Sequence, residues 1–407
     1  MSREIRGFGG QRSPKPVEKI EVTEDKKKLR LALMLLFGAL GIGLLTYAFV
    51  SWLGAEEGWQ IIETNTSYGV TCGSDFTFQY YLGGSGVSAT AQKKQLVKLY
   101  SQASAKAHQL FHETETFDGV ANVAYINSHP GEVIEVEDAL YQAFETILAD
   151  GRRNLYLGPV YDQYRNFCSA QTGAEEFDPT VNEEMNDYFL EIASFANDPE
   201  QIDLELLGEG KVRLTLSPEC QKYTKVNEIT NWIDFYWTKN AFIIDYLAET
   251  VTMEGYTLGR ISSVDGFARM LSENDTNLIA LYDRTGNVVK QVGTITAEGA
   301  VSVVLLHDYP LGTGDAFLYG EREDGSLVSP YIDTADGQSR CSTDTMLFTS
   351  TGLGCGEMVN RVIPVFLAPE IETDALMRLA DEGIRYAYWE EAALHSGDIT
   401  CEFTTAD

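Results

Sequence analysis

The sequence predicts an α+β fold, with a single folded domain behind one N-terminal transmembrane helix. Three observations support this prediction. An apolar run occupies residues 29–53, helical periodicity dominates up to about residue 253, and strand-like patterns dominate from residue 277 onward. Because the chain of 407 residues shows neither internal repeats nor a low-complexity linker, we expect one domain of mixed helices and strands rather than two.

The apolar run at residues 29–53 is long enough to cross a membrane. Its only charged residue is Arg30, at the very start. A helix rises ~1.5 Å per residue, so this length spans a hydrocarbon core ~30 Å thick. A buried core helix is usually shorter and carries a polar stripe, and a cleaved signal peptide has a shorter apolar region and no long polar tail before it. We therefore predict an uncleaved anchor.

The charges on either side of the anchor predict its orientation. Basic residues crowd positions 26–30, whereas Glu56 and Glu57 follow the anchor. The positive-inside rule then predicts a single-pass protein of the cell membrane with its N-terminus in the cytoplasm. The rings of Trp52 and Trp59 suit the outer interface. The predicted parts are a disordered cytoplasmic tail at 1–28, the anchor at 29–53, a tether at 54–67 and an extracytoplasmic domain at 68–407.

The charge balance excludes one class of partner. Of the 30 Lys and Arg residues nine lie in residues 1–30, as do only five of the 61 Asp and Glu residues, so the rest of the chain carries a net charge of about −35. Such a surface repels nucleic acid and anionic lipid. The sequence therefore predicts no nucleic-acid binding, and the acidity fits either solubility or an affinity for divalent cations.

Six cysteines follow the anchor, and an exported compartment permits disulfides between them. Cys341 and Cys355 form the nearest pair in sequence and would suit a structural staple, but the sequence leaves the pairing open. No two cysteines have C-x-x-C spacing, so neither a zinc site nor a redox motif is predicted. The full set is Cys72, Cys168, Cys220, Cys341, Cys355 and Cys401.

The first part of the domain shows mostly helical patterns. In the helix predicted at 90–112, Leu96, Leu99, Ala103 and Leu110 recur at three- and four-residue spacing, which gives an apolar face. The other elements predicted here are a strand at 68–81, helices at 136–149, after Pro179 and at 241–253, and a strand at 211–217.

The second part is predicted to be mostly β. Two runs rich in β-branched residues flank residues 284–287, whose sequence Arg-Thr-Gly-Asn is a strong hairpin signal. The predicted elements are strands at 277–283, 288–294, 300–306, 345–350, 362–368, 385–389 and 399–404, and a helix at 374–382.

Short motifs give little chemistry by themselves. Residues 83–86, Gly-Gly-Ser-Gly, lack the spacing of a phosphate-binding loop and are predicted to be a plain turn. His108 and His112 share a helix face but lack the glutamate of a zinc-protease motif, so we expect a solvated pair. No histidine has an identifiable Ser or Cys partner. Composition and spacing alone therefore predict an outward-facing acidic domain of unassigned activity.

A longer stretch, residues 117–165, carries a family resemblance. It resembles the FAD:protein FMN transferase (ApbE) family, and the resemblance extends along residues 68–407 in the family's order. It implies binding of FAD, use of Mg²⁺ and transfer of FMN to a Thr or Ser of a membrane redox protein, by an exported or membrane-anchored enzyme. The matching positions are Ile126, Asn127, Gly131, Val136, Leu140, Gly151, Asn154, Gly158 and Pro159.

The family's later motifs are altered in this chain. The D-x-G-x-x-x-K-G-Y-x-x-D motif falls on residues 234–245, where both acidic ends remain, Tyr236 and Ala241 replace the glycines, and Lys239 lies one place early. The Asn-x-Gly-Gly turn falls on 262–265 and has lost its paired glycines. The H-x-x-D-P-x-T-G motif falls on 330–337, where proline replaces the histidine. The metal-binding D-x-x-x-T motif falls on 357–361 and reads Glu-Met-Val-Asn-Arg.

These changes predict a family fold that has lost the transferase reaction and that acts by binding or assembly at the membrane. No catalytic residue is therefore assigned. Two alternatives remain: an active Mg²⁺-dependent transferase with divergent motifs, and a structural or adhesion ectodomain. If FAD and Mg²⁺ are still bound, the resemblance assigns the flavin to Arg153, Asn154, Lys239, Asp245 and Asp333, and the metal to Glu357. For Arg153, Asn154 and Asp245 the alternative is an ordinary turn or helix-surface residue.

Overall fold

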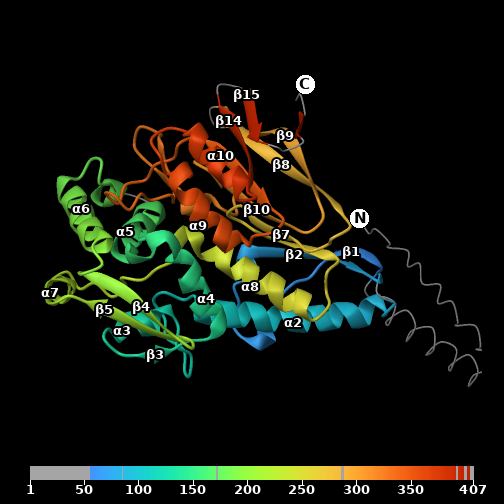
Figure 1. Ribbon diagram of the computed structural model, residues 1–407, viewed down its shortest axis with the longest axis horizontal. Helices are drawn as coiled ribbons and strands as arrows, with labels where there is room; N and C mark the ends of the chain where they lie inside the picture. Colours follow the sequence, from blue (N-terminus) through green and yellow to red (C-terminus); the bar gives the residue numbers. More distant parts are fainter. Residues whose placement is uncertain are drawn as a thin grey trace, which may run out of the picture. The chain divides into compact units, whose positions relative to one another are not determined.

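An antiparallel sheet of eight strands forms the centre of the folded unit (Figure 1). The computed structural model describes residues 56–84, 86–170, 173–285, 288–390, 393–397 and 401–403, all within the unit 56–407. In spatial order the strands are β1 (Gly58–Ile61), β2 (Phe76–Leu82), β6 (Gly259–Ser263), β7 (Phe267–Met270), β10 (Val301–His307), β13 (Thr345–Ser350), β14 (Arg385–Glu390) and β15 (Ala393–Gly397).

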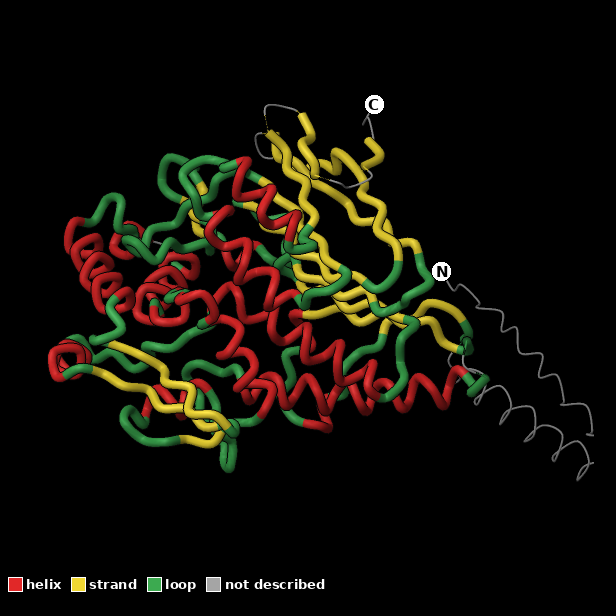
Figure 2. The backbone as a smooth tube through the Cα atoms, in the orientation of Figure 1, coloured by secondary structure: helices red, strands yellow, loops and turns green. Residues whose placement is uncertain are grey.

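Helices cover one face of this sheet (Figure 2). α2 (Ala89–Leu110) packs against α8 (Lys239–Met253), and α8 packs against α9 (Cys355–Phe366). α9 also contacts α4 (Asp138–Ile147) and α10 (Thr373–Asp381). Because α8 and α9 touch β7 and β10 directly, the main core lies between this helical layer and the sheet.

The middle of the sheet is buried on both faces. Every residue of β10 and β13 is buried. Side chains alternate along a strand, and Val303 and Leu305 of β10 pack against Leu281 and Ile295 on the face away from the helices. The elements on that face are β8 (Thr276–Thr285) and β9 (Val288–Glu298), with β16 (Cys401–Phe403) beside β9.

A second group of elements lies at the end of the helical layer away from β1 (Figure 1). A small antiparallel sheet, in the order β3–β5–β4, packs there with short helices. The elements are α3 (Val123–Ser128), β3 (Ile134–Glu135), α5 (Gly158–Ser169), α6 (Glu183–Asn197), β4 (Ile202–Gly208), β5 (Lys211–Leu216), α7 (Pro218–Val226), β11 (Gly320–Glu321) and β12 (Leu327–Val328).

Most of the predicted elements are confirmed. α2 begins at a serine N-cap, where the Ser88 hydroxyl accepts the Ala91 N–H, and its buried face includes Leu96 and Leu110. The α6 helix follows Pro179 as expected, and the 277–294 hairpin corresponds to β8 and β9. The helices predicted at 136–149, 241–253 and 374–382, and the strands predicted at 211–217, 300–306, 345–350 and 385–389, lie within two residues of the observed bounds at each end.

The strand predicted at 362–368 is wrong. These residues form the C-terminal half of α9 and the turn after it. A short apolar run rich in Val and Ile is compatible with a buried strand or a buried helix, and periodicity alone does not separate them. Within the predicted range, Val362, Ile363, Val365 and Phe366 are all buried, and the polar residues of the exposed face, Glu357 and Arg361, precede it, so the range alone shows no polar stripe.

The start of the folded unit also differs from the prediction. The strand predicted at 68–81 begins only at Phe76, because 3₁₀ turns at Thr66–Tyr68 and Gly73–Asp75 precede it. The sheet itself begins earlier, since β1 lies inside the range 54–67 that was predicted to be a tether. Gly58–Ile61 thus already belongs to the central sheet, ahead of Tyr68.

The five cysteines whose side chains are described are all free thiols: Cys72, Cys168, Cys220, Cys341 and Cys355. Cys341 lies beside the Ser329 hydroxyl, whereas Cys355 opens α9 and contacts the Val303 carbonyl. The staple expected between Cys341 and Cys355 is therefore absent from this structure. Burial raises the pKa of both thiols.

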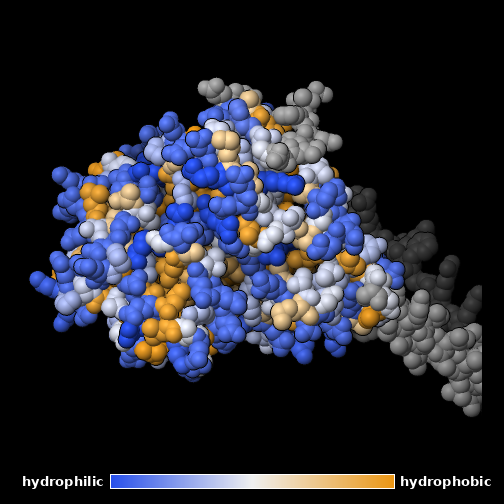
Figure 3. Space-filling model, in the orientation of Figure 1, coloured by the Kyte–Doolittle hydropathy of each residue, from blue (hydrophilic) through white to orange (hydrophobic). Residues whose placement is uncertain are grey.

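The anchor predicted at 29–53 and the tail before it lie outside the described residues. Among the residues that are described, no helix has the length and apolar character needed to cross a membrane. The face of the molecule drawn in Figure 3 is mostly hydrophilic, with scattered apolar patches. This surface agrees with the acidic composition.

Candidate functional site

A cavity of about 330 Å³ lies where α5, the start of α8 and the β6–β7 turn meet. α5 contributes Arg165, and the first two residues of α8 contribute Lys239 and Asn240. The β6–β7 turn contributes Asp265, and Trp237 closes one side. Most of the remaining lining is apolar, so the cavity combines a few charged groups with a largely hydrophobic wall. Such an arrangement is typical of small-molecule sites.

Three charged side chains in and beside this cavity form one ion-pair network with a buried aspartate. The Arg165 guanidinium lies 2.7 Å from the Asp234 carboxylate, which is fully buried, and 3.5 Å from that of Glu113. The Lys239 ammonium lies 3.2 Å from Glu113. Burial alone would raise the pKa of Glu113, but Lys239 and Arg165 outweigh it and lower that pKa to about 2. The Glu113 carboxylate therefore stays charged at neutral pH.

Three buried polar atoms of residues that line the cavity have no partner among the described residues. The Asn240 amide donates to one oxygen of Asp265 at 2.9 Å. The second Asp265 oxygen, the Asn240 carbonyl oxygen and the Trp237 indole N–H are buried, and no described residue forms a hydrogen bond with them. Buried polar groups are nearly always paired, so these atoms are available to a bound molecule that offers both a donor and an acceptor.

Asp265 gives a pH-dependent prediction. Burial raises the pKa of its carboxyl to about 6, above the value of an unfolded chain. The folded state therefore binds this proton more tightly, and the protein loses stability as the pH rises from about 4 to about 6. We expect Asp265→Asn to raise the free energy of unfolding by about 1 kcal/mol at pH 7.5 and to leave it unchanged at pH 4, in urea denaturation.

An exposed aspartate provides the control for this prediction. Asp118→Asn should change the stability at neither pH, because the Asp118 side chain is exposed. Equal stability of Asp265→Asn and the wild type at pH 7.5 would show that the Asp265 carboxylate is not penalised by its surroundings.

A second, smaller hollow of about 170 Å³ lies between α4, α8 and the start of α9. Asp245 and Glu357 both line it. Asp245 is already engaged, because its two carboxylate oxygens accept the N–H groups of Cys355 and Gly356 at 2.9 and 2.8 Å, and it also pairs with Arg269. Asp245 thus caps the N-terminus of α9 from the neighbouring helix.

No protein-family model and no curated protein matches the sequence. Solved structures do match the fold. The ApbE protein of Thermotoga maritima gives a TM-score of 0.56 at 11% identity, covering 79% of this chain and 94% of its own. The flavin transferase ApbE of Vibrio cholerae gives 0.57 at 11% identity, covering 84% and 98%. The flavinyl transferase ApbE of Pseudomonas stutzeri gives 0.53 at 14% identity, covering 84% and 94%.

The fold is that of the ApbE flavin transferases. At these identities the likeness concerns the fold alone. It confirms the resemblance read from residues 117–165, and it places the altered motifs of this chain in an ApbE-like fold.

Tyr236 stands where the resemblance expects a glycine. Its φ is +45°, in the left-handed region that glycine adopts readily and that a bulky residue rarely adopts. The backbone therefore has a conformation that suits the glycine of the motif, although a side chain is present. That ring stacks on Tyr161 with centroids 4.5 Å apart, and the Arg165 guanidinium lies 5.0 Å from its centre. It fills space beside the cavity that a glycine would leave open.

Glu357 lies in the first turn of α9 and pairs with Arg361, one turn later. Arg361 also donates to Glu382 at 2.9 Å. Mg²⁺ prefers several oxygen ligands in near-octahedral geometry. Within the described residues, no group of three or more His, Cys, Asp or Glu side chains could hold a metal ion. The residues present here therefore do not fit a Mg²⁺ site.

The other three candidate residues are placed elsewhere. Arg153 donates to the Ala196 and Ile202 carbonyls and stacks over Tyr156, so it joins α6 to β4. Asn154 is 4% exposed and outside both hollows. Asp333 closes the turn 333–337, in which Gly337 has φ +74°, and it pairs with an arginine. The 330–337 motif has thus kept its turn.

Of the six candidates, only Lys239 lines the larger cavity, and Asp245 and Glu357 line the smaller one. Sequence reasoning missed Glu113, Arg165 and Asp265. Arg165 ends the stretch that carries the resemblance, but no spacing singles it out. Glu113 and Asp265 come from segments far apart in the chain, so only the fold brings them together.

Proposed function

We propose that this chain is a membrane-anchored, extracytoplasmic domain of the ApbE fold that no longer transfers FMN and acts by binding or assembly at the membrane. The anchor rests on the apolar run at 29–53 and on the charges around it. The observation that most supports the loss of FMN transfer is one contact, in which the Arg361 guanidinium donates a hydrogen bond to the Glu357 carboxylate.

The pairing of Arg361 with Glu357 opposes the metal that the transfer reaction uses. A divalent cation would neutralise the diphosphate of FAD while the bond between its phosphates breaks. The guanidinium of Arg361 keeps its charge at any physiological pH. A cation at Glu357 would have to displace this arginine and, among the described residues, would still lack a cluster of acidic ligands. This disagreement between the residues and the metal supports a domain without the reaction.

Two other contacts support the same proposal. Asp245 already accepts two backbone N–H groups and pairs with Arg269, so its oxygens are committed to the fold. Tyr236 adds a ring at a glycine position. The remaining cavity of about 330 Å³ is at the lower end of the range for small-molecule sites. It suits one ring system with a donor and an acceptor better than a whole dinucleotide.

An active Mg²⁺-dependent FAD:protein FMN transferase that modifies a membrane redox protein is the alternative. It is favoured by the acidic residues that remain at three motif positions, Asp234, Asp245 and Glu357. Lys239 at the cavity wall would also suit an anionic ligand.

A product assay separates the two functions. We expect the full-length protein in detergent, incubated with FAD, Mg²⁺ and a threonine-containing acceptor peptide, to release no more AMP than a protein-free control. Release of AMP together with a flavin-labelled peptide would establish the alternative. Extraction of cell membranes with alkaline carbonate tests the anchor separately, because an anchored protein stays in the pellet.

A further inference from the structure

β1 is an edge strand with an open side. It pairs with β2, and no other described strand lies beside it. Beyond its end, the Ile62 N–H donates to the Phe78 carbonyl at 2.8 Å. Hydrogen-bonded and non-hydrogen-bonded pairs alternate along an antiparallel ladder. Because Ile62 is hydrogen-bonded to Phe78, the backbone N–H and C=O groups of Gln60 also point toward β2, whereas those of Trp59 and Ile61 point outward. The open edge thus presents two donors and two acceptors.

Among the described residues, none of the usual protective devices blocks this edge. Natural edge strands are commonly guarded by a proline, a lysine or a bulge. The sequence of β1 is Gly-Trp-Gln-Ile, and its pairing with β2 is regular. Trp59 and Ile61 are each 52% exposed. The edge therefore exposes apolar side chains together with backbone groups that pair with no described strand.

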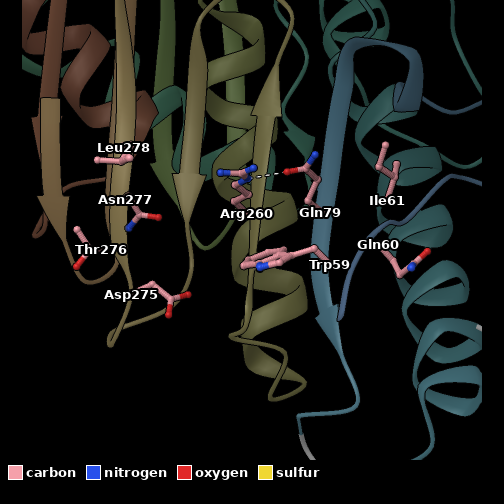
Figure 4. Close-up of a pocket in the computed structure, with 10 residues that line it drawn as sticks. Trp59, Gln60, Ile61, Gln79, Arg260, Asp275, Thr276, Asn277 and Leu278 are labelled. Atoms are coloured by element: carbon pink, nitrogen blue, oxygen red, sulfur yellow. Dashed lines mark hydrogen bonds between the residues drawn. The ribbon is translucent and has the colours of Figure 1, made fainter. Parts of the chain in front are cut away.

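Hollows lie on both sides of this strand. One of about 640 Å³ is bounded by Trp59, Gln79, Arg260 and the start of β8. Figure 4 shows the Trp59 ring lying toward Arg260, which is joined to Gln79 by a hydrogen bond, with the residues of β8 across the hollow. The other, of about 720 Å³, separates β1 from Lys93 on α2. An added strand would have room for side chains on either face.

The acidic residues at the two ends of β1 indicate the occupant, whereas the basic Arg260 and Lys93 line the hollows beside the strand. Glu56 and Glu57 precede the strand and Glu63 follows it, and all three are exposed. If β1 of a second copy paired antiparallel with this strand, the glutamates of the two copies would face each other. Anionic lipid would be repelled in the same way. A partner with basic residues at the two ends of an extended segment would be attracted.

We propose that β1 accepts an extended peptide segment of another protein as an added strand. Backbone hydrogen bonds to Trp59 and Ile61 would hold the segment, alternate apolar side chains would enter the hollow beside Trp59, and Lys or Arg at its ends would meet the flanking glutamates. This inference goes beyond the proposed function, and it does not depend on whether the protein transfers FMN.

The test uses two synthetic peptides of alternating valine and threonine, one flanked by lysines and its twin by glutamates. We expect the full-length protein in detergent to bind the lysine peptide at least tenfold more tightly, by fluorescence anisotropy. Hydrogen exchange should show slowed exchange at the amides of Trp59 and Ile61. No binding of the lysine peptide, or equal binding of both peptides, would overturn the proposal.

A proline at the outward-facing position gives the sharper comparison. Ile61→Pro removes a backbone N–H that faces away from β2, so no hydrogen bond to β2 is lost. Prolines are tolerated at such positions of edge strands. It should weaken peptide binding at least tenfold, whereas Ile61→Thr, which keeps the N–H, should bind like the wild type. Unchanged binding by Ile61→Pro would contradict the strand geometry.

Charge reversal keeps the proposal testable if the proline variant unfolds. The triple variant Glu56→Lys, Glu57→Lys, Glu63→Lys should prefer the glutamate peptide, and an unchanged preference would overturn the role of these charges. Two further outcomes would assign the edge to another occupant and overturn the proposal. One is a dimer of the full chain that Ile61→Pro dissociates, and the other is full protection of the Trp59 amide by lipid nanodiscs without peptide.

Discussion

Replacing Asp245 with alanine is expected to lower the free energy of unfolding by about 3 kcal/mol, a larger loss than we expect from any other single substitution. The carboxylate holds the first two N–H groups of α9 and the Arg269 guanidinium. Its removal leaves a helix N-terminus uncapped and a largely buried positive charge unpaired. Gly354 lies so close that a Cβ there would come within 2.4 Å of the carboxylate. Urea denaturation measures the loss.

Asparagine at the same position is the matched control. Asp245→Asn keeps one acceptor for an α9 N–H but turns an amide N–H₂ toward the other, so it should lose nearly as much stability as alanine. A loss below about 1 kcal/mol for Asp245→Ala would show that the carboxylate is free for another task, such as ligand binding.

Glu113→Gln is expected to cost about 2–3 kcal/mol of stability at pH 7. Burial tends to raise the pKa of Glu113, but the positive charges of Lys239 and Arg165 outweigh this effect and lower that pKa to about 2. A lowered carboxyl pKa stabilises the folded state above the unfolded value of about 4.3, and this contribution is lost as the pH falls toward 2. The difference in the free energy of unfolding between the variant and the wild type should therefore become smaller below about pH 4.5. Denaturation curves from pH 7 to pH 3 measure it.

Glu115, two residues further on, is the control. It is exposed and lies 3.9 Å from His112, so Glu115→Gln should change stability by less than about 0.5 kcal/mol. A Glu113→Gln difference that stays constant between pH 7 and pH 3 would mean that the ion-pair network is not what stabilises this carboxylate.

Periodicity predicted the elements whose faces differ in polarity. α2 alternates buried and exposed residues at helical spacing, and the β8–β9 hairpin has a recognisable turn sequence. The strand prediction at 362–368 failed because this range covers only the C-terminal half of α9, whereas the polar residues of the helix's exposed face, Glu357 and Arg361, lie before it. β1 was missed because four residues give too short a pattern, and only pairing with β2 makes them a strand. Local patterns report a contrast between two faces, and they fail where the stretch considered is too short to contain both faces.

Sequence motifs also predicted the candidate site only in part. Family motifs led to Lys239, Asp245 and Glu357, which do line hollows, but motifs do not reveal what else a side chain touches. Only the structure shows that Asp245 accepts backbone N–H groups of α9, that Glu357 pairs with Arg361 and that Tyr236 has a left-handed backbone conformation. Arg165 and Asp265 reach the cavity, and Glu113 reaches the ion-pair network beside it, from three separate segments, so only the fold shows that they lie together.

Calorimetric titration of the full-length protein with FAD, with Mg²⁺ or with EDTA, tests the loss of the transfer reaction most directly. Because Arg361 occupies Glu357, we predict that Mg²⁺ leaves the affinity for FAD unchanged, whether FAD binds weakly or not at all. An affinity for FAD that rises tenfold or more when Mg²⁺ replaces EDTA would contradict this prediction and would support the alternative function, an active transferase.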